Sequence, residues 1–377
     1  MIMYKKNIVD NTQNYNGLSK DRQLMEFTSV PKESKNQINK AGKILVAADS
    51  MPREQKLALD LAKRWRACHA YPINTFQATL RTKLRSYQKE PIAAQRLKRM
   101  PTIIDKLNRY PMMNLSTMQD IGGVRAILNS VKDVYKLVGE YRDNSRFTHK
   151  LINDKDYIEN PRSEDGYRGI HLIYSYKNKQ AQNYDGLRIE MQIRTKYQHI
   201  WATAVESMGT FLGQALKSRQ GDQDWLDFFA LTSSAFAHKE RTTLVPRYAD
   251  LSLEETSIEI AKAQEKLGAL DMMNGLSIAA DAINKTKGTR KTSFYHLVIL
   301  DSLEKTVQIK AYDRNSFEQA VCDYELAEAE ASGGVKIEPV LVSAGPLNNL
   351  RRAYPNFFLD IDEFIQLVTK IVANKKR

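Results

Sequence analysis

The stretch Leu187–Arg194, Leu-Arg-Ile-Glu-Met-Gln-Ile-Arg, alternates strictly between apolar and polar side chains. A period of two predicts a β-strand with one buried face. The other face sets the carboxylate of Glu190 between the guanidiniums of Arg188 and Arg194. The amide of Gln192 lies in the same row. This polar row has two interpretations, a ligand-binding surface or a strand with cross-strand ion pairs.

A helix is expected directly after this strand. Thr195 belongs to the residue types that cap helix N-termini. Apolar residues then follow at helical spacing, at Tyr197, Trp201, Ala202 and Val205. The polar row therefore lies on a strand that ends at a helix N-terminus, where backbone N–H groups favour anions.

The 377-residue chain is 42% hydrophobic and 27% charged. Its length indicates two domains, or one large domain with an appendage. The 57 Lys and Arg residues exceed the 44 Asp and Glu residues, which gives a net charge of +13. This excess favours a polyanionic partner: nucleic acid, nucleotide phosphates or an anionic membrane. The two cysteines, Cys68 and Cys322, exclude a disulfide framework and a cysteine-rich zinc site.

No apolar stretch is long enough to span a bilayer, and the N-terminus lacks the apolar segment of a signal peptide. We therefore expect a cytoplasmic protein. Composition divides the chain into a polar N-terminal region over residues 1–50, a main domain over residues 51–288 with a helical extension from about residue 222, and a C-terminal unit over residues 289–377. A short helix around Lys20–Val30 is the alternative to an unstructured N-terminal region.

The 29 residues from Arg81 to Arg109 contain nine basic residues and two acidic ones. A solvated helix face is one explanation for such a charge. The apolar residues Ile103, Ile104 and Leu107 instead indicate an amphipathic helix with one basic wall. Like charges on that wall repel each other by about 1 kcal/mol per pair at about 4 Å in water. A bound anion would relieve this repulsion.

The segment Ile121–Leu128 predicts a second buried strand, which contains the single charge of Arg125. A charge inside an apolar strand is costly unless it is paired or liganded. Arg125 is therefore a candidate site residue, or it forms an ion pair with Asp120 or Glu190.

The turn-rich loop Asp165–Gly169 leads into another predicted strand, Ile170–Tyr176. Tyr167 is expected to lie exposed on this loop. An exposed tyrosine beside a basic, carboxylate-bearing strand can stack on a base. The alternative is a loop residue without a role.

Polar side chains are expected to gather near the ends of these strands: Asp120, Arg125, Tyr167, His171, Glu190, Gln192 and Arg194. Two carboxylates on adjacent strands suit Mg²⁺, which takes few protein carboxylates and otherwise phosphate oxygens and water. The basic wall suits a triphosphate, so the pattern indicates phosphoryl or pyrophosphoryl transfer. The chain contains no P-loop motif and no protein-kinase motif.

Four segments in this order resemble the RelA/SpoT-type alarmone synthetases, over about residues 75–215. They are Arg96-x-Lys98 with Lys106 and Arg109, Asp120-Ile-Gly-Gly-Val-Arg125, Gly166-Tyr167-Arg168-Gly-Ile-His171, and Glu190-Met-Gln-Ile-Arg-Thr195. The resemblance implies an α+β fold with a mixed β-sheet flanked by helices, similar to nucleotidyltransferases. It also implies an enzyme that moves the β,γ-pyrophosphate of ATP onto a 3′-hydroxyl.

The resemblance assigns a role to each polar residue of these segments. The implied roles are adenine binding for Arg96 and Arg125, phosphate binding for Lys98, Lys106 and Arg109, Mg²⁺ binding for Asp120 and Glu190, catalysis for Asp120, Glu190, Gln192 and Arg194, and acceptor binding for Tyr167 and His171. Glu190 alternatively helps to deprotonate the attacking hydroxyl. Tyr167 would stack on the acceptor base. His171 would contact acceptor phosphate or ribose, or serve as a structural strand residue.

Two departures from the family pattern bear on the reaction. The chain has no His-Asp dipeptide, so the hydrolase half of the long bifunctional relatives is missing. Many small alarmone synthetases carry a Glu-His pair in the helix after the last motif, whereas Glu206 is followed here by Ser207. This difference leaves a guanosine nucleotide in question as the acceptor.

The C-terminal unit, with Tyr354-Pro-Asn-Phe357, is similar to the antitoxin part of the fused toxin–antitoxin branch known as CapRel. In that branch the synthetase domain pyrophosphorylates the 3′ CCA end of tRNA and stops translation. A small, degenerate zinc-finger-like domain blocks the ATP site through an aromatic motif until a phage capsid protein releases it. The resemblance implies this autoinhibitory role for Tyr354 and Phe357, which are otherwise ordinary core residues.

The leading prediction is therefore a tRNA-modifying pyrophosphokinase toxin in anti-phage defence, which we expect to act as a monomer. The alternative is a small alarmone synthetase that makes (p)ppGpp from ATP and GDP or GTP, with a C-terminal regulatory domain. A third possibility is a catalytically inactive RNA-binding protein, against which the intact Asp120 and Glu190 argue.

Overall fold

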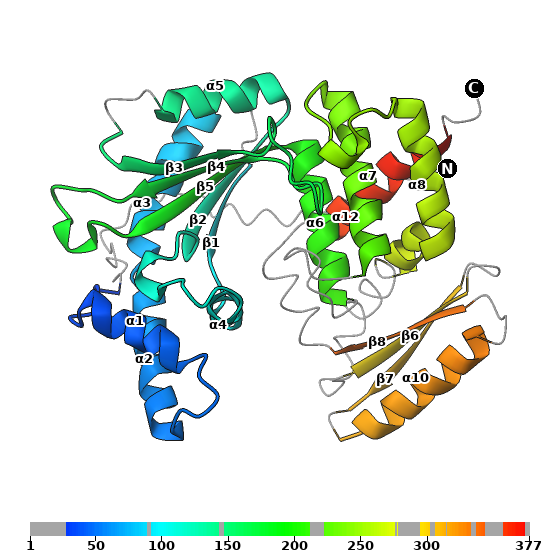
Figure 1. Ribbon diagram of the computed structural model, residues 1–377, viewed down its shortest axis with the longest axis horizontal. Coiled ribbons are helices and arrows are strands. Elements are labelled where there is room, and N and C mark those ends of the chain that lie inside the picture. The colour runs from blue at the N-terminus through cyan, green and yellow to red at the C-terminus, as the bar shows by residue number, and fades with distance from the viewer. Residues whose placement is uncertain are drawn as a thin grey trace, which may run out of the picture.

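The computed structural model describes residues 28–88, 92–142, 147–211, 222–275, 277, 295–301, 306–313, 315–332, 337–343 and 357–373. Its elements form three groups (Figure 1). We call them the sheet unit (residues 35–195), the helical unit (residues 196–267 with residues 357–373) and the C-terminal sheet (residues 295–343).

A five-stranded sheet lies at the centre of the sheet unit. Its strands are β1 (Ile92–Leu97), β2 (Gly122–Leu128), β3 (Lys150–Asp156), β4 (Ile170–Ser175) and β5 (Arg188–Thr195). They are ordered β1-β2-β5-β4-β3, with β2 and β5 parallel and the other neighbours antiparallel. The predicted mixed sheet is confirmed. The strand β1 lies inside the basic segment that the sequence pattern assigns to a helix, so that assignment is wrong for residues 92–97.

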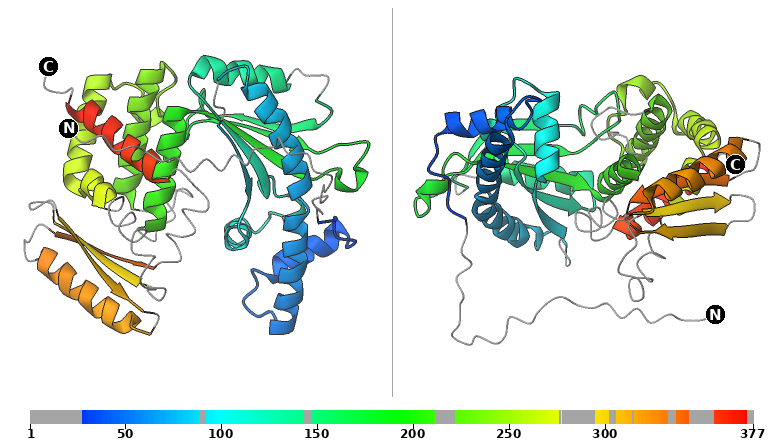
Figure 2. Two further views of the ribbon diagram at one scale, coloured as in Figure 1. Left: turned by 180° about the vertical axis from the view of Figure 1, so that it is seen from behind. Right: turned by 90° about the horizontal axis from the view of Figure 1, so that it is seen from below.

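The apolar row of β5 lies in the main hydrophobic core. Leu187, Ile189, Met191 and Ile193 are at most 3% exposed. Two helices, α3 (Ala70–Leu84) and α5 (Val131–Arg142), contribute the facing apolar side chains. The view from behind in Figure 2 shows α3 running across the sheet. One face of β5 is therefore sealed, as its alternation predicts, and the polar row occupies the other face.

Other helices border the sheet unit: α1 (Lys35–Ile44), α2 (Pro52–Ala67) and α4 (Met100–Arg109), with the short 3₁₀ turns η1 (Leu115–Thr117) and η2 (Gln182–Tyr184). Helix α4 buries Ile103 and Leu107, which confirms the amphipathic pattern there. Helix α1 begins at a capping box in which Ser34 and Gln37 exchange hydrogen bonds. Residues 28–30 are not helical, and the rest of the helix expected around Lys20–Val30 lies outside the described residues.

The helical unit contains α6 (Lys196–Phe211), α7 (Gln223–Glu240), η4 (Pro246–Tyr248), α8 (Leu253–Leu267) and α12 (Phe357–Ala373). Helix α12 packs on α6 and α8. Its Phe364 is fully buried, with its ring centre 6.4, 6.1 and 5.9 Å from those of Phe228, Phe229 and Phe236 of α7. The sequence pattern assigns this last helix to the C-terminal unit. The structure packs it in the helical unit instead, because its apolar stripe completes the core formed by α6, α7 and α8.

The C-terminal sheet has the strands β6 (Tyr295–Asp301), β7 (Thr306–Tyr312) and β8 (Ile337–Ser343), and the helix α10 (Phe317–Ser332). The strands are antiparallel in the order β7-β6-β8, and α10 packs against β8 and β6. Tyr354 lies outside the described residues, as does the side chain of Phe357, so their predicted role stays a prediction. In the described part of the chain, no helix combines the length and the apolar character needed to cross a membrane.

Candidate functional site

Strand register brings polar side chains together on one face of the sheet. Gly123 lies opposite Glu190, Arg125 lies opposite Gln192, and Gln192 lies opposite His171 on its other side. Side chains alternate between the two faces of a sheet. The side chains of Arg125, Gln192 and His171 therefore point to the same face, opposite to the one that α3 and α5 cover.

This face forms a cavity of about 570 Å³. All the residues that the four motifs assign to ATP, Mg²⁺ or the acceptor line it: Arg96, Lys98, Lys106, Arg109, Asp120, Arg125, Tyr167, His171, Glu190, Gln192 and Arg194. The structure thus brings the predicted site residues together in one place, while their individual roles stay predictions.

Asp120, directly before β2, is held by two lysines. Lys98 Nζ and Lys106 Nζ each lie 2.9 Å from Asp120 Oδ2. Burial raises the pKa of Asp120, but the charges of the two lysines outweigh it and keep the pKa below its ordinary value. Asp120 Oδ1 is buried and has no hydrogen-bond partner among the residues that the structure describes. One oxygen of this carboxylate therefore faces two cations, and the other keeps its lone pairs free.

Five polar side chains form a closed ring of hydrogen bonds. Arg194 Nη2 donates to Tyr167 Oη at 2.7 Å and to Gln192 Oε1 at 2.8 Å. Tyr167 Oη lies 2.5 Å from His171 Nε2, and His171 Nδ1 lies 3.0 Å from Glu190 Oε1. Gln192 Nε2 closes the ring by donating to Glu190 Oε2 at 2.7 Å. The polar row of β5 therefore belongs to one connected network that also includes β4 and the loop before it. We call this network the Glu190 ring.

The Glu190 ring has one consistent assignment of protons. Burial lowers the pKa of His171, so its imidazole is neutral at pH 7. Burial raises the pKa of Tyr167, which therefore keeps its proton and donates it to His171 Nε2. His171 Nδ1–H then donates to Glu190, the tautomer being fixed by its two partners. Burial opposes the ionisation of Glu190, but the contacts with His171 and Gln192 outweigh it and hold its pKa well below the ordinary value.

Tyr167 is only 5% exposed, so the expectation of an exposed loop tyrosine is wrong. The guanidinium carbons of Arg162 and Arg194 lie 4.4 and 5.0 Å from the centre of its ring. The loop turns onto α7 because Gly166 has a φ of 78°, and a Cβ there would lie 2.8 Å from Ala230 Cα. Stacking of a base on Tyr167 would require Arg162 to move away.

The predicted adenine-binding arginines lie on neighbouring strands. Arg96 of β1 lies opposite Gly123, two residues before Arg125 of β2. Arg96 Nη1 lies 4.0 Å from Glu206 Oε1 of α6, and Arg125 Nε lies 3.4 Å from Gln192 Oε1. The basic wall predicted for one helix is thus divided between β1, which carries Arg96, and the segment around α4.

Sequence reasoning missed several residues that line the cavity, among them Arg99, Lys155, Tyr157, Arg162 and Glu206. Lys155 of β3 lies opposite His171, and only the strand pairing reveals this neighbour. Arg162 lies 2.8 Å from the buried Asp165. Arg162, Glu164 and Asp165 lie directly before the Gly-Tyr-Arg-Gly segment in the sequence. This group of charges is the sequence feature that could have identified Arg162 as a site residue.

The residues present fit a Mg²⁺ ion that is shared with phosphate. Within the described ranges, no three His, Cys, Asp or Glu side chains are grouped as metal ligands. Mg²⁺ is commonly bound by one or two carboxylates together with substrate phosphates. Asp120 has a free oxygen, and Glu190 lies on the adjacent parallel strand, close enough to raise the pKa of Asp120. Both carboxylates line the same cavity.

Comparisons with known proteins agree with this geometry. Residues 95–210 match the family model described as "Region found in RelA / SpoT proteins". GTP pyrophosphokinase YjbM from Bacillus subtilis is 31% identical over 115 residues, which are 30% of this chain and 53% of that protein. GTP pyrophosphokinase YwaC from the same organism is 30% identical over 114 residues, which are 29% of this chain and 52% of that protein. The chain thus spans about half the length of these curated relatives.

Solved structures include the small alarmone synthetase 1 from Bacillus subtilis, which is 23% identical with a TM-score of 0.40. That alignment covers 48% of this chain and 93% of the synthetase. The assignment to a family comes from the sequence match, which spans every predicted ATP, metal and acceptor residue. We call residues 95–210, which match this family model, the RelA/SpoT-type region.

Proposed function

We propose that the chain is an ATP-dependent pyrophosphokinase, a transferase that moves the β,γ-pyrophosphate of ATP onto a 3′-hydroxyl. One observation carries this proposal. The RelA/SpoT-type region places a lysine–aspartate cluster and the Glu190 ring in one cavity of about 570 Å³. Cations suit the triphosphate and paired carboxylates suit the Mg²⁺ that accompanies it.

In this proposal the purine of ATP lies between the guanidiniums of Arg96 and Arg125, which stack on its faces. The triphosphate lies against Lys98, Lys106 and Arg109. Both Lys98 and Lys106 form ion pairs with Asp120. When phosphates replace Asp120 as their partners, both oxygens of Asp120 become available to a cation. Asp120 and Glu190 would then hold Mg²⁺, which neutralises charge on the phosphate oxygens and orients them.

The transfer itself requires little covalent chemistry from the protein. The acceptor oxygen attacks the β-phosphorus, the bond from that phosphorus to the α,β-bridging oxygen breaks, and AMP leaves. Glu190 orients the acceptor hydroxyl and receives its proton late in the step, because a carboxylate with a lowered pKa is a weak base. Gln192 and Arg194 keep Glu190 in place through the ring.

For the acceptor, we propose the 3′ CCA end of tRNA, so that the enzyme is a toxin that blocks translation. The net charge of +13 supports a polyanionic partner. In the helix after the last motif, Glu206 is followed by Ser207, where many small alarmone synthetases carry a Glu-His pair. The C-terminal part would block the ATP site through Tyr354 and Phe357 until a phage capsid protein binds, with the chain acting as a cytoplasmic monomer.

A second candidate is the synthesis of (p)ppGpp from ATP and GDP or GTP. The two curated relatives favour it, because both are named GTP pyrophosphokinases. In this case His171 and Arg162 would contact a guanosine nucleotide, and Arg162 would first have to leave the ring of Tyr167.

The deciding experiment is a transfer assay with γ-³²P-ATP and the full chain, offering tRNA, GDP and GTP in parallel. Label on tRNA supports the toxin, and label on GDP or GTP alone supports the alarmone synthetase. Label on no acceptor, from both the full chain and Tyr354→Ala, contradicts the proposed enzyme. Tyr354→Ala is preferable to truncation at residue 288, because truncation would remove α12 from the core of the helical unit. Activity that rises in Tyr354→Ala supports inhibition by the C-terminal part.

A further inference from the structure

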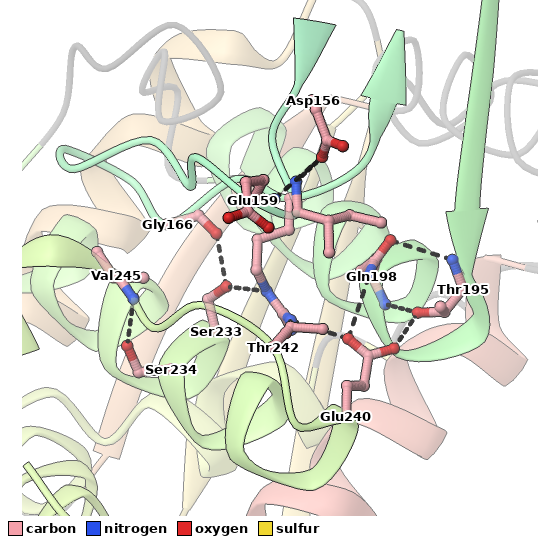
Figure 3. A network of polar contacts seen from close by, with 12 residues as sticks. Asp156, Glu159, Gly166, Thr195, Gln198, Ser233, Ser234, Glu240, Thr242 and Val245 are labelled. Carbon is pink, nitrogen blue, oxygen red and sulfur yellow. Dashed lines mark hydrogen bonds and ion pairs between the residues drawn. The ribbon is translucent and has the colours of Figure 1, made fainter. Parts of the chain in front are cut away.

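Glu240, the last residue of α7, lies at the centre of a buried polar network (Figure 3). Its side chain is 5% exposed. Both of its oxygens accept hydrogen bonds: Oε1 accepts from the hydroxyl of Thr195, and Oε2 accepts from Gln198 Nε2 at 3.1 Å and from Arg168 Nη1 at 2.8 Å. One carboxylate therefore joins three segments of the chain.

Arg168 connects this carboxylate to the loop that carries Tyr167. The side chain of Arg168 is 1% exposed. Its Nε donates to Ser233 Oγ at 3.1 Å, and Ser233 Oγ donates to the carbonyl of Gly166 at 2.5 Å. Residues on both sides of Tyr167 are thus attached to α7.

Thr195 and Gln198 connect the same carboxylate to the end of β5. Thr195 N donates to Gln198 Oε1 at 3.1 Å, and Gln198 N donates to Thr195 Oγ1 at 3.3 Å. This reciprocal pair is a capping box, which confirms Thr195 as the helix cap predicted from the sequence. Thr195 directly follows Arg194, so Glu240 also holds the neighbour of the arginine in the Glu190 ring.

We infer that Glu240 is a positioning residue, which holds Tyr167 and Arg194 in hydrogen-bond contact through Arg168 and Thr195. The inference rests on the proposed pyrophosphokinase function for its catalytic consequence, but not for its structural one. Glu240 lies outside the segment 95–210 that matches the RelA/SpoT model. The ring in that segment therefore depends on a carboxylate that the segment does not contain.

The consequence follows from the geometry of the ring. Tyr167 donates to His171, and His171 donates to Glu190. If the loop that carries Tyr167 shifts, the Tyr167 hydroxyl leaves both Arg194 and His171. His171 Nε2 then loses its donor, and the tautomer that presents Nδ1–H to Glu190 is no longer favoured. Misplacement of a catalytic group by about 1 Å can reduce a rate about a hundredfold. Glu240 should therefore affect kcat and leave ATP binding unchanged.

The test compares Glu240→Gln with the wild type by ¹⁵N NMR of the histidine side chains, whose nitrogen shifts report the tautomer. The chain has six histidines, and a His171→Gln sample identifies the signals of His171. We expect the His171 signals to shift in Glu240→Gln, and kcat to fall about tenfold to a hundredfold with the KM for ATP unchanged. Unchanged His171 signals in a folded Glu240→Gln protein would overturn the inference.

The matched control is Glu259→Gln, which removes a carboxylate of the same helical unit that pairs with Lys262 on the surface. It should change neither the His171 signals nor kcat. If Glu240→Gln does not fold, Thr195→Val and Thr195→Ser test the same connection, because only serine keeps the hydroxyl. Identical His171 signals in these two proteins would equally refute the inference. Failure of the proposed function looks different: the wild type transfers label to no acceptor, while the NMR shifts still respond to Glu240→Gln.

Discussion

The sheet unit and the helical unit contribute different kinds of residue to the candidate site. The sheet unit supplies nearly all the side chains that line the cavity, and all of those that the motifs single out. The helical unit supplies the packing and the buried carboxylate of Glu240 that hold the loop of Tyr167 and the end of β5. The residues that the motifs single out and the carboxylate of Glu240 therefore lie in separate stretches of sequence, and the match to the RelA/SpoT model ends at residue 210, before Glu240.

The largest expected effect comes from a cavity-lining residue of the sheet unit, Glu190. Glu190→Gln removes the charge of the ring carboxylate, and we expect transfer to fall about 10²- to 10⁴-fold. The fold should persist, because glutamine still accepts one hydrogen bond at this position. Activity measured with γ-³²P-ATP and the midpoint of thermal unfolding check both statements. Transfer at the wild-type rate would exclude a catalytic role for Glu190.

The next effect concerns the helical unit and appears in stability. Phe364→Ala in α12 empties the space between three buried phenylalanines of α7. We expect the free energy of unfolding to fall by about 3–5 kcal/mol. Urea unfolding followed by circular dichroism measures it, and Phe364→Leu is the matched control with a smaller loss. A loss under about 1 kcal/mol for Phe364→Ala would show that α12 does not pack in this core.

The third prediction concerns the pH dependence of the unfolding free energy, to which a buried histidine of the sheet unit contributes. His69 is buried, and burial lowers its pKa to about 4. Between the unfolded-state pKa of about 6.5 and this value, the unfolded chain binds a proton that the folded chain does not, so acidification favours unfolding. We expect His69 to account for a loss of at most about 3 kcal/mol between pH 7 and pH 4. His69→Asn should flatten the pH profile of the unfolding free energy. An unchanged slope would contradict the burial of a neutral imidazole.

The smallest effect tests single phosphate contacts. Lys106→Ala removes one of the two lysines on Asp120, and we expect the KM for ATP to rise about tenfold, the equivalent of about 1.4 kcal/mol. The midpoint of thermal unfolding should change little, because Lys98 still neutralises Asp120. Lys262→Ala, an exposed lysine of the helical unit, is the control. An unchanged KM for ATP in Lys106→Ala would remove this residue from the ATP site.

Local sequence patterns predicted the parts of the site that depend on local structure. The alternation of Leu187–Arg194 predicted both faces of β5, and the motifs predicted which polar residues share a cavity. The burial of Tyr167 was not predictable, because it depends on α7, a helix more than fifty residues away in the sequence. The strand β1 was missed because its sequence, Ile-Ala-Ala-Gln-Arg-Leu, lacks the strict alternation of apolar and polar residues that predicted β5.

The position of α12 could not be read from its own pattern. An apolar stripe shows that a helix packs somewhere, but it does not identify the partner. The stripe of α12 fits the helical unit, whereas proximity in sequence favoured the C-terminal sheet. The connection of Glu240 to the Glu190 ring was equally hidden, because the hydrogen bonds of Glu240 join residues between 42 and 72 positions apart.

The place of α12 has a consequence during synthesis. A ribosome releases the chain from its N-terminus onward, so the RelA/SpoT-type region emerges long before residues 357–373. Until that last helix emerges, the phenylalanines of α7 lack their contact with Phe364, and α7 is the helix that ends at Glu240. The core that contains α7 is therefore completed only after α12 has emerged and packed with α6, α7 and α8.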